Sequence, residues 1–175
     1  MYTSTRLGQW LDRIGSAMMV AAMLFLAAMA ILMNVEIAGR TLLKTSTLIA
    51  DEYSGYFFSW LFLGALTHVQ RSNGLLTVTI LTSLMPEGAR RFLDVLAALI
   101  SAVLTAILTW STAAMVYSNW EFSSKSLSVA QTPLFIPQLA MPIGLGIVTL
   151  SFLETAYSRT LGRARPVVDT PGEII

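Results

Sequence analysis

Residues 51–74 read DEYSGYFFSWLFLGALTHVQRSNG, and the rest of the chain is organised around this stretch. It begins with two carboxylates, continues as an uncharged aromatic and aliphatic block, and reaches Arg71 just before a Ser-Asn-Gly turn. As a helix from Glu52 to Arg71 it would be about 30 Å long, which matches the hydrocarbon thickness of a bilayer. Its acids and its base lie where the helix dipole favours them. The stretch therefore predicts a membrane-spanning helix with a defined direction.

The composition is that of an integral membrane protein rather than a soluble domain. Of the 175 residues, 55% are hydrophobic and 12% are charged, and the mean hydropathy is +0.68. The absence of cysteine excludes disulfide exchange, thiolate catalysis and iron–sulfur ligation. A single histidine, His68, cannot supply the ligand pair of a membrane b-type haem. The sequence therefore predicts no metal or other cofactor, and without a basic patch it predicts no nucleic-acid partner.

Long apolar runs predict four transmembrane helices in a single domain over residues 1–160. The expected spans are about 14–38, 52–71, 92–118 and 137–157. A cleaved signal peptide is an alternative interpretation of the first run, because Arg13 precedes it and residues 28–30 resemble a cleavage site. Against cleavage, the run is longer than a usual signal core and continues to Val35.

Local signals also predict where these helices begin, bend and end. The first helix is expected to continue beyond the bilayer and to end at Gly39 or in the Thr-Ser-Thr cluster at 45–47. Pro86 is expected to start the third helix. Pro137 is expected in the first turn of the last span, with Pro142 bending that span near its start.

Two segments are predicted to lie outside the bilayer core. Residues 75–85 are too few to cross it, but wound as a helix they carry hydroxyls on one face and apolar groups on another, which is typical of an interfacial amphipathic helix. Residues 161–175 contain Pro, Gly and acids and are expected to form a disordered cytoplasmic tail. The predicted fold class is thus an all-α integral membrane protein with four transmembrane helices and a short interfacial helix between the second and the third.

Two side-chain stripes are interpreted first as packing surfaces. The aromatic stripe falls at i, i+3, i+4 and i+7 in the second span and comprises Tyr53, Tyr56, Phe57 and Trp60. It indicates an interface belt or a packing face, with ligand stacking as the alternative. The hydroxyl stripe of the third span comprises Ser101, Thr105, Thr109 and Thr112. Helix packing is the first interpretation of that stripe and a polar permeation path the second.

The distribution of basic residues predicts the orientation in the membrane. With four spans, both termini lie on one side, and that side collects Arg6, Arg13, Arg71, Arg90, Arg91, Arg159, Arg163 and Arg165. The opposite loops hold only Arg40, Lys44 and Lys125. Because cytoplasmic loops carry an excess of Lys and Arg, both termini are expected in the cytoplasm and the acidic start of the second span on the outer side.

Ionisable residues deep in a span usually mark ion or proton paths, and the sequence places none near a midplane. Those considered all lie near predicted span ends: Glu36, Arg40, Asp51, Glu52, His68, Asp94 and Glu154. We therefore predict no catalytic and no substrate-binding residues in this chain. A protein that crosses the membrane four times without internal chemistry is interpreted as a subunit of a larger assembly.

Several motifs resemble one family of such subunits. An acidic entry followed by aromatics, the Leu63-Gly64-Ala65 step and the Arg71-x-x-Gly74 exit are similar to the small membrane subunit of tripartite ATP-independent periplasmic (TRAP) transporters, the DctQ-like proteins. The pair of Glu36 with Arg40 and the Pro137-x4-Pro142-x-Gly144 segment resemble the same family, and the resemblance covers roughly residues 10–160. The residues singled out for a structural or partner-contact role are Glu36, Arg40, Asp51, Glu52, Tyr56, Trp60, Gly64, Arg71, Pro137 and Pro142.

The resemblance implies an accessory scaffold of a sodium-driven importer in the bacterial inner membrane, and not an enzyme. Its expected partners are a large M-type transport subunit, a periplasmic binding protein that delivers an organic acid, and the lipid bilayer. One departure stands out, because family members often carry a His and an Asp where this chain has Leu75 and Thr79. If those residues serve subunit contact in the family, this chain makes the contact differently or belongs to a divergent branch.

Other classes of protein remain as alternatives at this point. A self-sufficient, dimeric four-span transporter would use Glu36 as its coupling carboxylate, although Glu36 lies at the edge of the first span. A membrane enzyme ranks last, since the chain lacks the usual nucleophile and metal-ligand sets. The pair of Glu36 with Arg40 is interpreted first as a helical ion pair at i, i+4, and secondly as a contact with a partner.

Overall fold

The computed structural model describes residues 6–44, 46, 49–72 and 86–161. The helices in this part of the chain are α1 (Arg6–Leu43), α2 (Ala50–Arg71), α4 (Glu87–Glu121), α5 (Phe135–Gln138) and α6 (Ala140–Thr160). The described residues form no named strand, and Lys125 and Pro133 make one isolated bridge in the loop before α5. The prediction of an all-α protein is therefore confirmed, and a helix occupies each of the four ranges expected to span.

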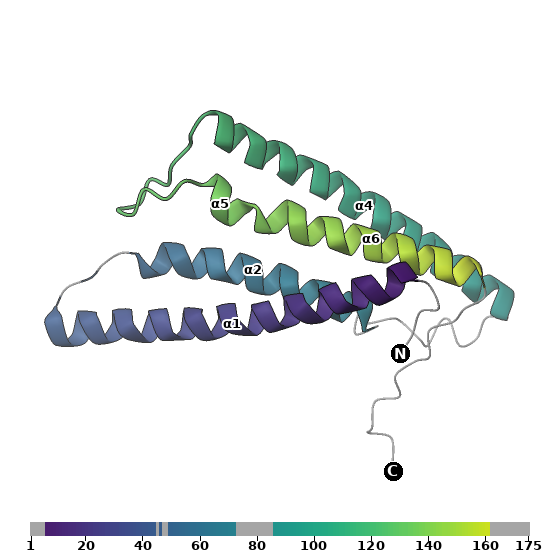
Figure 1. Ribbon diagram of the computed structural model, residues 1–175, viewed down its shortest axis with the longest axis horizontal. Helices are drawn as coiled ribbons and strands as arrows, with labels where there is room; N and C mark the ends of the chain where they lie inside the picture. Colours follow the sequence, from purple (N-terminus) through teal and green to yellow (C-terminus); the bar gives the residue numbers. More distant parts are fainter. Residues whose placement is uncertain (1–5, 45, 47–48, 73–85, 162–175) are drawn as a thin grey trace, which may run out of the picture.

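The four long helices run along the long axis of the molecule as two hairpins (Figure 1). One hairpin consists of α1 packed along α2, and the other of α4 packed along α6. The hairpins meet chiefly where α2 lies beside α6, and α1 touches α6 through a smaller contact. Because α2 and α6 are the inner helices of the two hairpins, α1 and α4 present the outer faces of the molecule.

Three of these helices are long and apolar enough to cross a membrane: residues Arg6–Leu42, Gly88–Glu121 and Phe135–Thr160. This supports a multi-pass membrane protein. α2 is not among the three, although its 22 residues would extend about 33 Å. It carries acids in its first turn and His68 and Arg71 in its last. It packs against both α1 and α6.

The helix ends refine the local predictions. α1 ends at Leu43, just before the predicted Thr-Ser-Thr cluster, and Lys44 follows with a left-handed φ of 51°. Gly39 lies inside α1, so its prediction as a helix end is wrong: one glycine within a strongly apolar helix does not stop it. α4 starts at Glu87 with Pro86 as its N-cap residue, as expected.

The last span breaks near its start, within one turn of Pro142, in agreement with the predicted bend. Pro137 is buried at the end of α5, and Pro142 lies in the first turn of α6. The break between the two helices falls at Leu139. A proline lacks the N–H that would bond the carbonyl four residues earlier, so Pro142 leaves the carbonyl of Gln138 without its helical partner. The kink therefore appears one turn before the proline that causes it.

The two side-chain stripes do lie at helix contacts. The ring of Phe25 on α1 packs against Phe57 and Trp60 of α2, at centroid distances of 5.7 and 5.8 Å. Thr109 on α4 lies 3.5 Å from Thr149 on α6, oxygen to oxygen. The hydroxyls of Thr105, Thr109 and Thr112 otherwise donate to carbonyls of their own helix. This arrangement favours the packing interpretation of both stripes.

Several predictions lie outside the described residues. These are the interfacial helix at 75–85, the departure at Leu75 and Thr79, and the tail from residue 162 onward.

Candidate functional site

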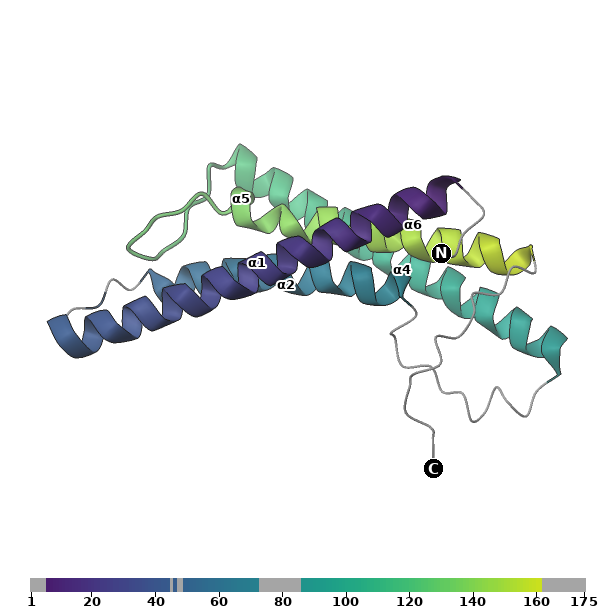
Figure 2. The same ribbon diagram turned by 60° about the horizontal axis from the view of Figure 1, so that its bottom comes forward.

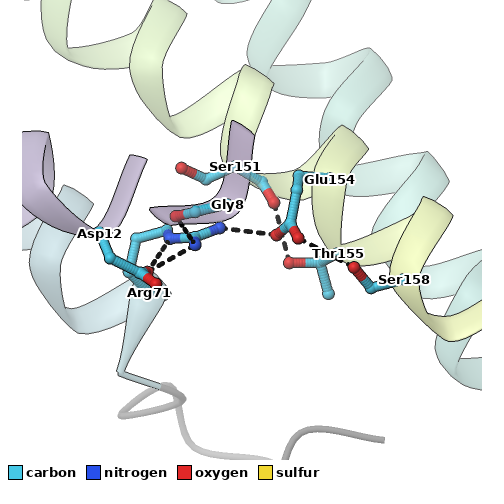
Figure 3. A network of polar contacts seen from close by, with 7 residues as sticks. All are labelled: Gly8, Asp12, Arg71, Ser151, Glu154, Thr155 and Ser158. Carbon is cyan, nitrogen blue, oxygen red and sulfur yellow. Dashed lines mark hydrogen bonds and ion pairs between the residues drawn. The ribbon is translucent and has the colours of Figure 1, made fainter. Parts of the chain in front are cut away.

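The most elaborate polar cluster of the described residues surrounds Arg71, at the end of α2 (Figure 3). Its Nη1 donates to Oε2 of Glu154 on α6 at 2.7 Å. Its Nε donates to Oδ1 of Asp12 on α1 at 2.8 Å, and Nη2 donates to the same oxygen and to the carbonyl of Gly8 at 2.8 Å. One guanidinium thus links α2 to both of the helices that pack against it. We call Asp12, Arg71, Glu154 and Ser158 the Arg71 network.

The central ion pair of this network is buried. The side chains of Arg71 and Glu154 are 3% and 2% exposed, whereas that of Asp12 is 40% exposed. Ser158, one turn after Glu154, donates its hydroxyl to Oε1 of that carboxylate at 2.8 Å. A buried ion pair is tolerated only when its remaining donors and acceptors are satisfied, and both oxygens of Glu154 have a partner here. The network therefore joins the two hairpins at the end where α2 and α6 finish.

Glycines lie at close contacts of α2 with α1 and of α6 with α2. A Cβ on Gly64 of α2 would lie 2.8 Å from the carbonyl oxygen of Met18 on α1. A Cβ on Gly144 of α6 would lie 2.7 Å from the Cβ of Leu63 on α2. Small residues at such contacts are the usual means of close helix packing in membranes. The structure thus assigns Gly64 a packing role between α1 and α2.

A second polar cluster lies at the opposite end, where α1 leads into α2. Arg40 Nε donates to Oε1 of Glu36 at 2.9 Å, so the predicted ion pair is present. Ser46 donates to the same oxygen at 2.7 Å, and the Glu36 side chain is only 9% exposed. Arg40 also lies 3.8 Å from Asp51, whose side chain is 76% exposed. This cluster ties the end of α1 to the start of α2.

Glu52 extends these contacts to the second hairpin. Its carboxylate accepts hydrogen bonds from Tyr56, one turn along α2, and from Ser128 in the loop between α4 and α5. Thr132 of the same loop donates to the hydroxyl of Tyr53 at 3.4 Å. The two hairpins are therefore connected by polar contacts at both ends of the bundle.

The proline break opens an apolar groove beside α4. It has a volume of about 420 Å³ and is lined by Ala113, Val116, Tyr117, Trp120, Phe135, Leu139 and Pro142. Asn119 of α4 donates a hydrogen bond to Gln138 of α5 at 2.6 Å. Of the predicted residues, Pro142 lines this groove and Pro137 is buried.

The structure does not bring the predicted residues together at one place. Arg71 lies at one end with Asp12 and Glu154, while Glu36, Arg40, Asp51, Glu52 and Tyr56 lie at the other. Sequence reasoning missed Asp12, Gly8 and Ser158 entirely. A usable signal existed, because Asp12 and Glu154 are acids near predicted span ends on the same side as Arg71.

These polar clusters join helices to one another. In the described residues, no group of three or more His, Cys, Asp or Glu side chains is arranged to hold a metal ion. The carboxylates of Glu36, Glu52 and Glu154 each accept a hydrogen bond from an arginine, serine or tyrosine side chain. The arrangement holds helices together at two levels of the bundle.

Comparison with protein families identifies the class of this protein. The family model for tripartite ATP-independent periplasmic transporters, DctQ component, matches residues 29–162. The chain therefore belongs to the DctQ family, as its motifs predicted, and is a small permease subunit of a TRAP transporter. This family is a transporter component and not an enzyme family. A search of curated proteins found no match.

Proposed function

We propose that this chain is the bracing subunit of a sodium-driven uptake system and does not itself bind or carry solute. In this proposal a periplasmic binding protein delivers an organic acid, and a large M-type subunit moves the acid and sodium across the inner membrane. The small subunit holds the large one in position. α2 serves as the fourth span, both termini lie in the cytoplasm, and the Arg71 network lies at the cytoplasmic end.

The observation that carries this proposal is that buried polar groups of the bundle are paired with one another. Arg71 and Glu154, both almost fully buried, bond to each other and to neighbours on α1 and α6. A carrier needs ionisable groups that can exchange a substrate or ion, whereas a brace needs helices locked to one another. The contacts at both ends of the two hairpins meet the second requirement.

The apolar outer faces supply the surface that such a brace needs. α4 carries large apolar side chains that are more than half exposed, including Ile100, Val103, Leu104, Ile107 and Trp110. α1 carries a similar set along its middle, including Val20, Leu24, Leu26 and Ile31. In a membrane these faces contact lipid or another helical bundle.

Reconstitution tests the proposal directly. The chain is purified with and without its co-expressed large subunit, and sodium-dependent uptake is measured in liposomes supplied with the binding protein. We expect co-purification of the two membrane subunits, uptake only when all components are present, and none from the small subunit alone. Uptake or proton-coupled efflux by this chain alone, abolished by Glu36→Ala, would instead establish the dimeric-transporter alternative.

A further inference from the structure

The first turns of α1 have two faces of different character. Toward the bundle they present Gly8, Leu11, Asp12 and Gly15, where Leu11 is 5% exposed and Gly8 and Asp12 bond to Arg71. The opposite face carries Arg6, Trp10 and Arg13 at i, i+4 and i+7, all three exposed. Residues at this spacing share one face of a helix. We call Arg6, Trp10 and Arg13 the outward basic face.

No described acid neutralises the positive charge of the outward basic face. Within the part of the chain that the structure describes, the side chains of Arg6 and Arg13 make no ion pair or hydrogen bond. The nearest acid in sequence, Asp12, points to the other side of the helix, where Arg71 binds it. The indole of Trp10, between the two arginines, is 66% exposed.

We propose that this face binds the phosphate headgroup of an anionic phospholipid at the cytoplasmic surface of the membrane. The inference rests on the proposed orientation, in which this end of α1 faces the cytoplasm. Arginine matches phosphate with a planar, two-pronged donor set, and tryptophan prefers the headgroup level of a bilayer. The uncharged run of α1 starts at Ile14, directly after Arg13, so the arginines lie where headgroups meet hydrocarbon.

The position of α1 gives such a lipid a structural consequence. In Figure 2 the first turns of α1 lie beside α6, at the end of the molecule that holds the Arg71 network. Asp12 of that network is flanked in sequence by residues of both faces. A lipid bound to the outward basic face would therefore hold the first turn of α1 in the position in which Gly8 and Asp12 meet Arg71.

The test compares lipids on the purified full-length chain in an uncharged detergent. Phosphatidylglycerol, phosphatidylcholine and soluble glycerol phosphate are titrated separately, and the unfolding temperature and bound lipid are measured by thermal melting and native mass spectrometry. We expect only phosphatidylglycerol to bind and raise the unfolding temperature. The Arg6→Gln/Arg13→Gln variant should need about 25-fold more of it, since each arginine near an anionic surface contributes roughly a fivefold factor.

Arg90→Gln is the matched control, because Arg90 is an exposed base at the start of α4 with no tryptophan one turn away. It should bind phosphatidylglycerol as the unmodified chain does. Equal affinity of the double variant and the unmodified chain, or equal effects of phosphatidylcholine, would overturn the proposal. An equal effect of glycerol phosphate would assign the face to free phosphates instead.

If the double variant does not fold, Arg6→Lys/Arg13→Lys replaces it, with a smaller loss expected because the charge remains but the two-pronged geometry is lost. Since none of these measurements involves the large subunit, the lipid proposal and the bracing proposal can fail independently.

Discussion

The guanidinium of Arg71 on α2 makes polar contacts with two neighbouring helices, α1 and α6. Arg71 bonds to α1 through Asp12 and Gly8, and to α6 through Glu154. The two carboxylates differ in their exposure, since Glu154 is 2% exposed and Asp12 is 40% exposed. Solvent can therefore replace Arg71 at Asp12 but not at Glu154.

Removal of Arg71 should be the most damaging single change in the network. Arg71→Met leaves Glu154 charged and buried, and we expect a loss of about 3–5 kcal/mol of stability. Arg71→Met/Glu154→Met removes both buried charges and should be more stable than Arg71→Met alone, because apolar side chains of similar size often replace a buried pair at little cost. Thermal and denaturant unfolding in detergent measure both. A double variant less stable than the single one would show that the charges contribute more than their burial costs.

Two buried serines on α6, Ser158 and Ser151, allow the hydrogen bond to Glu154 to be tested against a matched control. Ser158 donates to Glu154, whereas the buried Oγ of Ser151 has no hydrogen-bond partner among the described residues. Ser158→Ala should therefore cost roughly 1.5–3 kcal/mol, the usual range for a hydrogen bond to a charged group. Ser151→Ala should change stability by less than about 0.5 kcal/mol or increase it, because no bond is lost. Equal losses in the two variants would indicate a packing effect common to both positions.

At the scale of the elements, α2 decides how the two hairpins fit together. It contacts α1 through Gly64, and α6 through Leu63 and Arg71. Its aromatic face packs on Phe25 of α1. A helix that packs against neighbouring helices on two sides tolerates little added side-chain volume on either side.

Glycine substitutions test this directly. Gly64→Ala places a methyl group 2.8 Å from the backbone oxygen of Met18, which cannot turn away, and should cost about 1–3 kcal/mol. Gly55→Ala on the same helix is the control, because its Cβ would meet nothing within 4 Å. That change should stabilise α2 by up to about 1 kcal/mol through helix propensity. Unfolding temperatures of the two variants should move in opposite directions, and parallel shifts would contradict the packing role of Gly64.

The contact between α2 and α6 allows a more specific test of glycine packing. Gly144→Ala would bring a new methyl group 2.7 Å from the Cβ of Leu63. Leu63→Ala retains that Cβ, so Gly144→Ala should cost as much stability in the Leu63→Ala chain as in the unmodified chain. Leu63→Gly removes the Cβ, so Gly144→Ala should cost little relative to Leu63→Gly alone. The unfolding temperatures of both double variants are compared with those of their Leu63 single variants. A loss of the cost in both backgrounds would mean that the outer atoms of Leu63 cause the clash.

At the scale of the whole molecule, the bundle has two distinct ends. One holds the Arg71 network, and there Arg159 pairs with Asp94 at 3.0 Å while Arg91 donates to carbonyls at the end of α6. The other holds the carboxylates Glu36, Asp51 and Glu52 with their hydroxyl and arginine partners. This polarity follows the charge distribution from which we propose the orientation.

The orientation can be checked with engineered cysteines, since the chain has none of its own. Leu127→Cys in the loop after α4 should react with a membrane-impermeant maleimide in intact cells, because Leu127 is fully exposed at the proposed outer end. Leu161→Cys, at the end of α6, should react only after the membrane is permeabilised. Labelling in the reverse pattern would invert the proposed topology.

Much of the architecture could be predicted because its signals are local. Hydropathy placed the four helices, and Pro86 marked the start of α4. Pro142 marked the bend near the start of the last span, and the break falls at Leu139 because the missing hydrogen bond belongs to the carbonyl of Gln138. The candidate residues at the two ends were recognised as charges near span ends, but most of their partners were not.

The sequence by itself determined that this is a helical membrane protein, where its helices lie and to which family it belongs, because helix formation and hydropathy act over a turn or a single span. Only the tertiary structure decided what Arg71 binds. Its partners Asp12 and Glu154 are 59 and 83 residues away, and they meet only when α1 and α6 pack on the two sides of α2. Glycine contacts set that packing, and a glycine's neighbours depend on helix register and crossing, which no local pattern records.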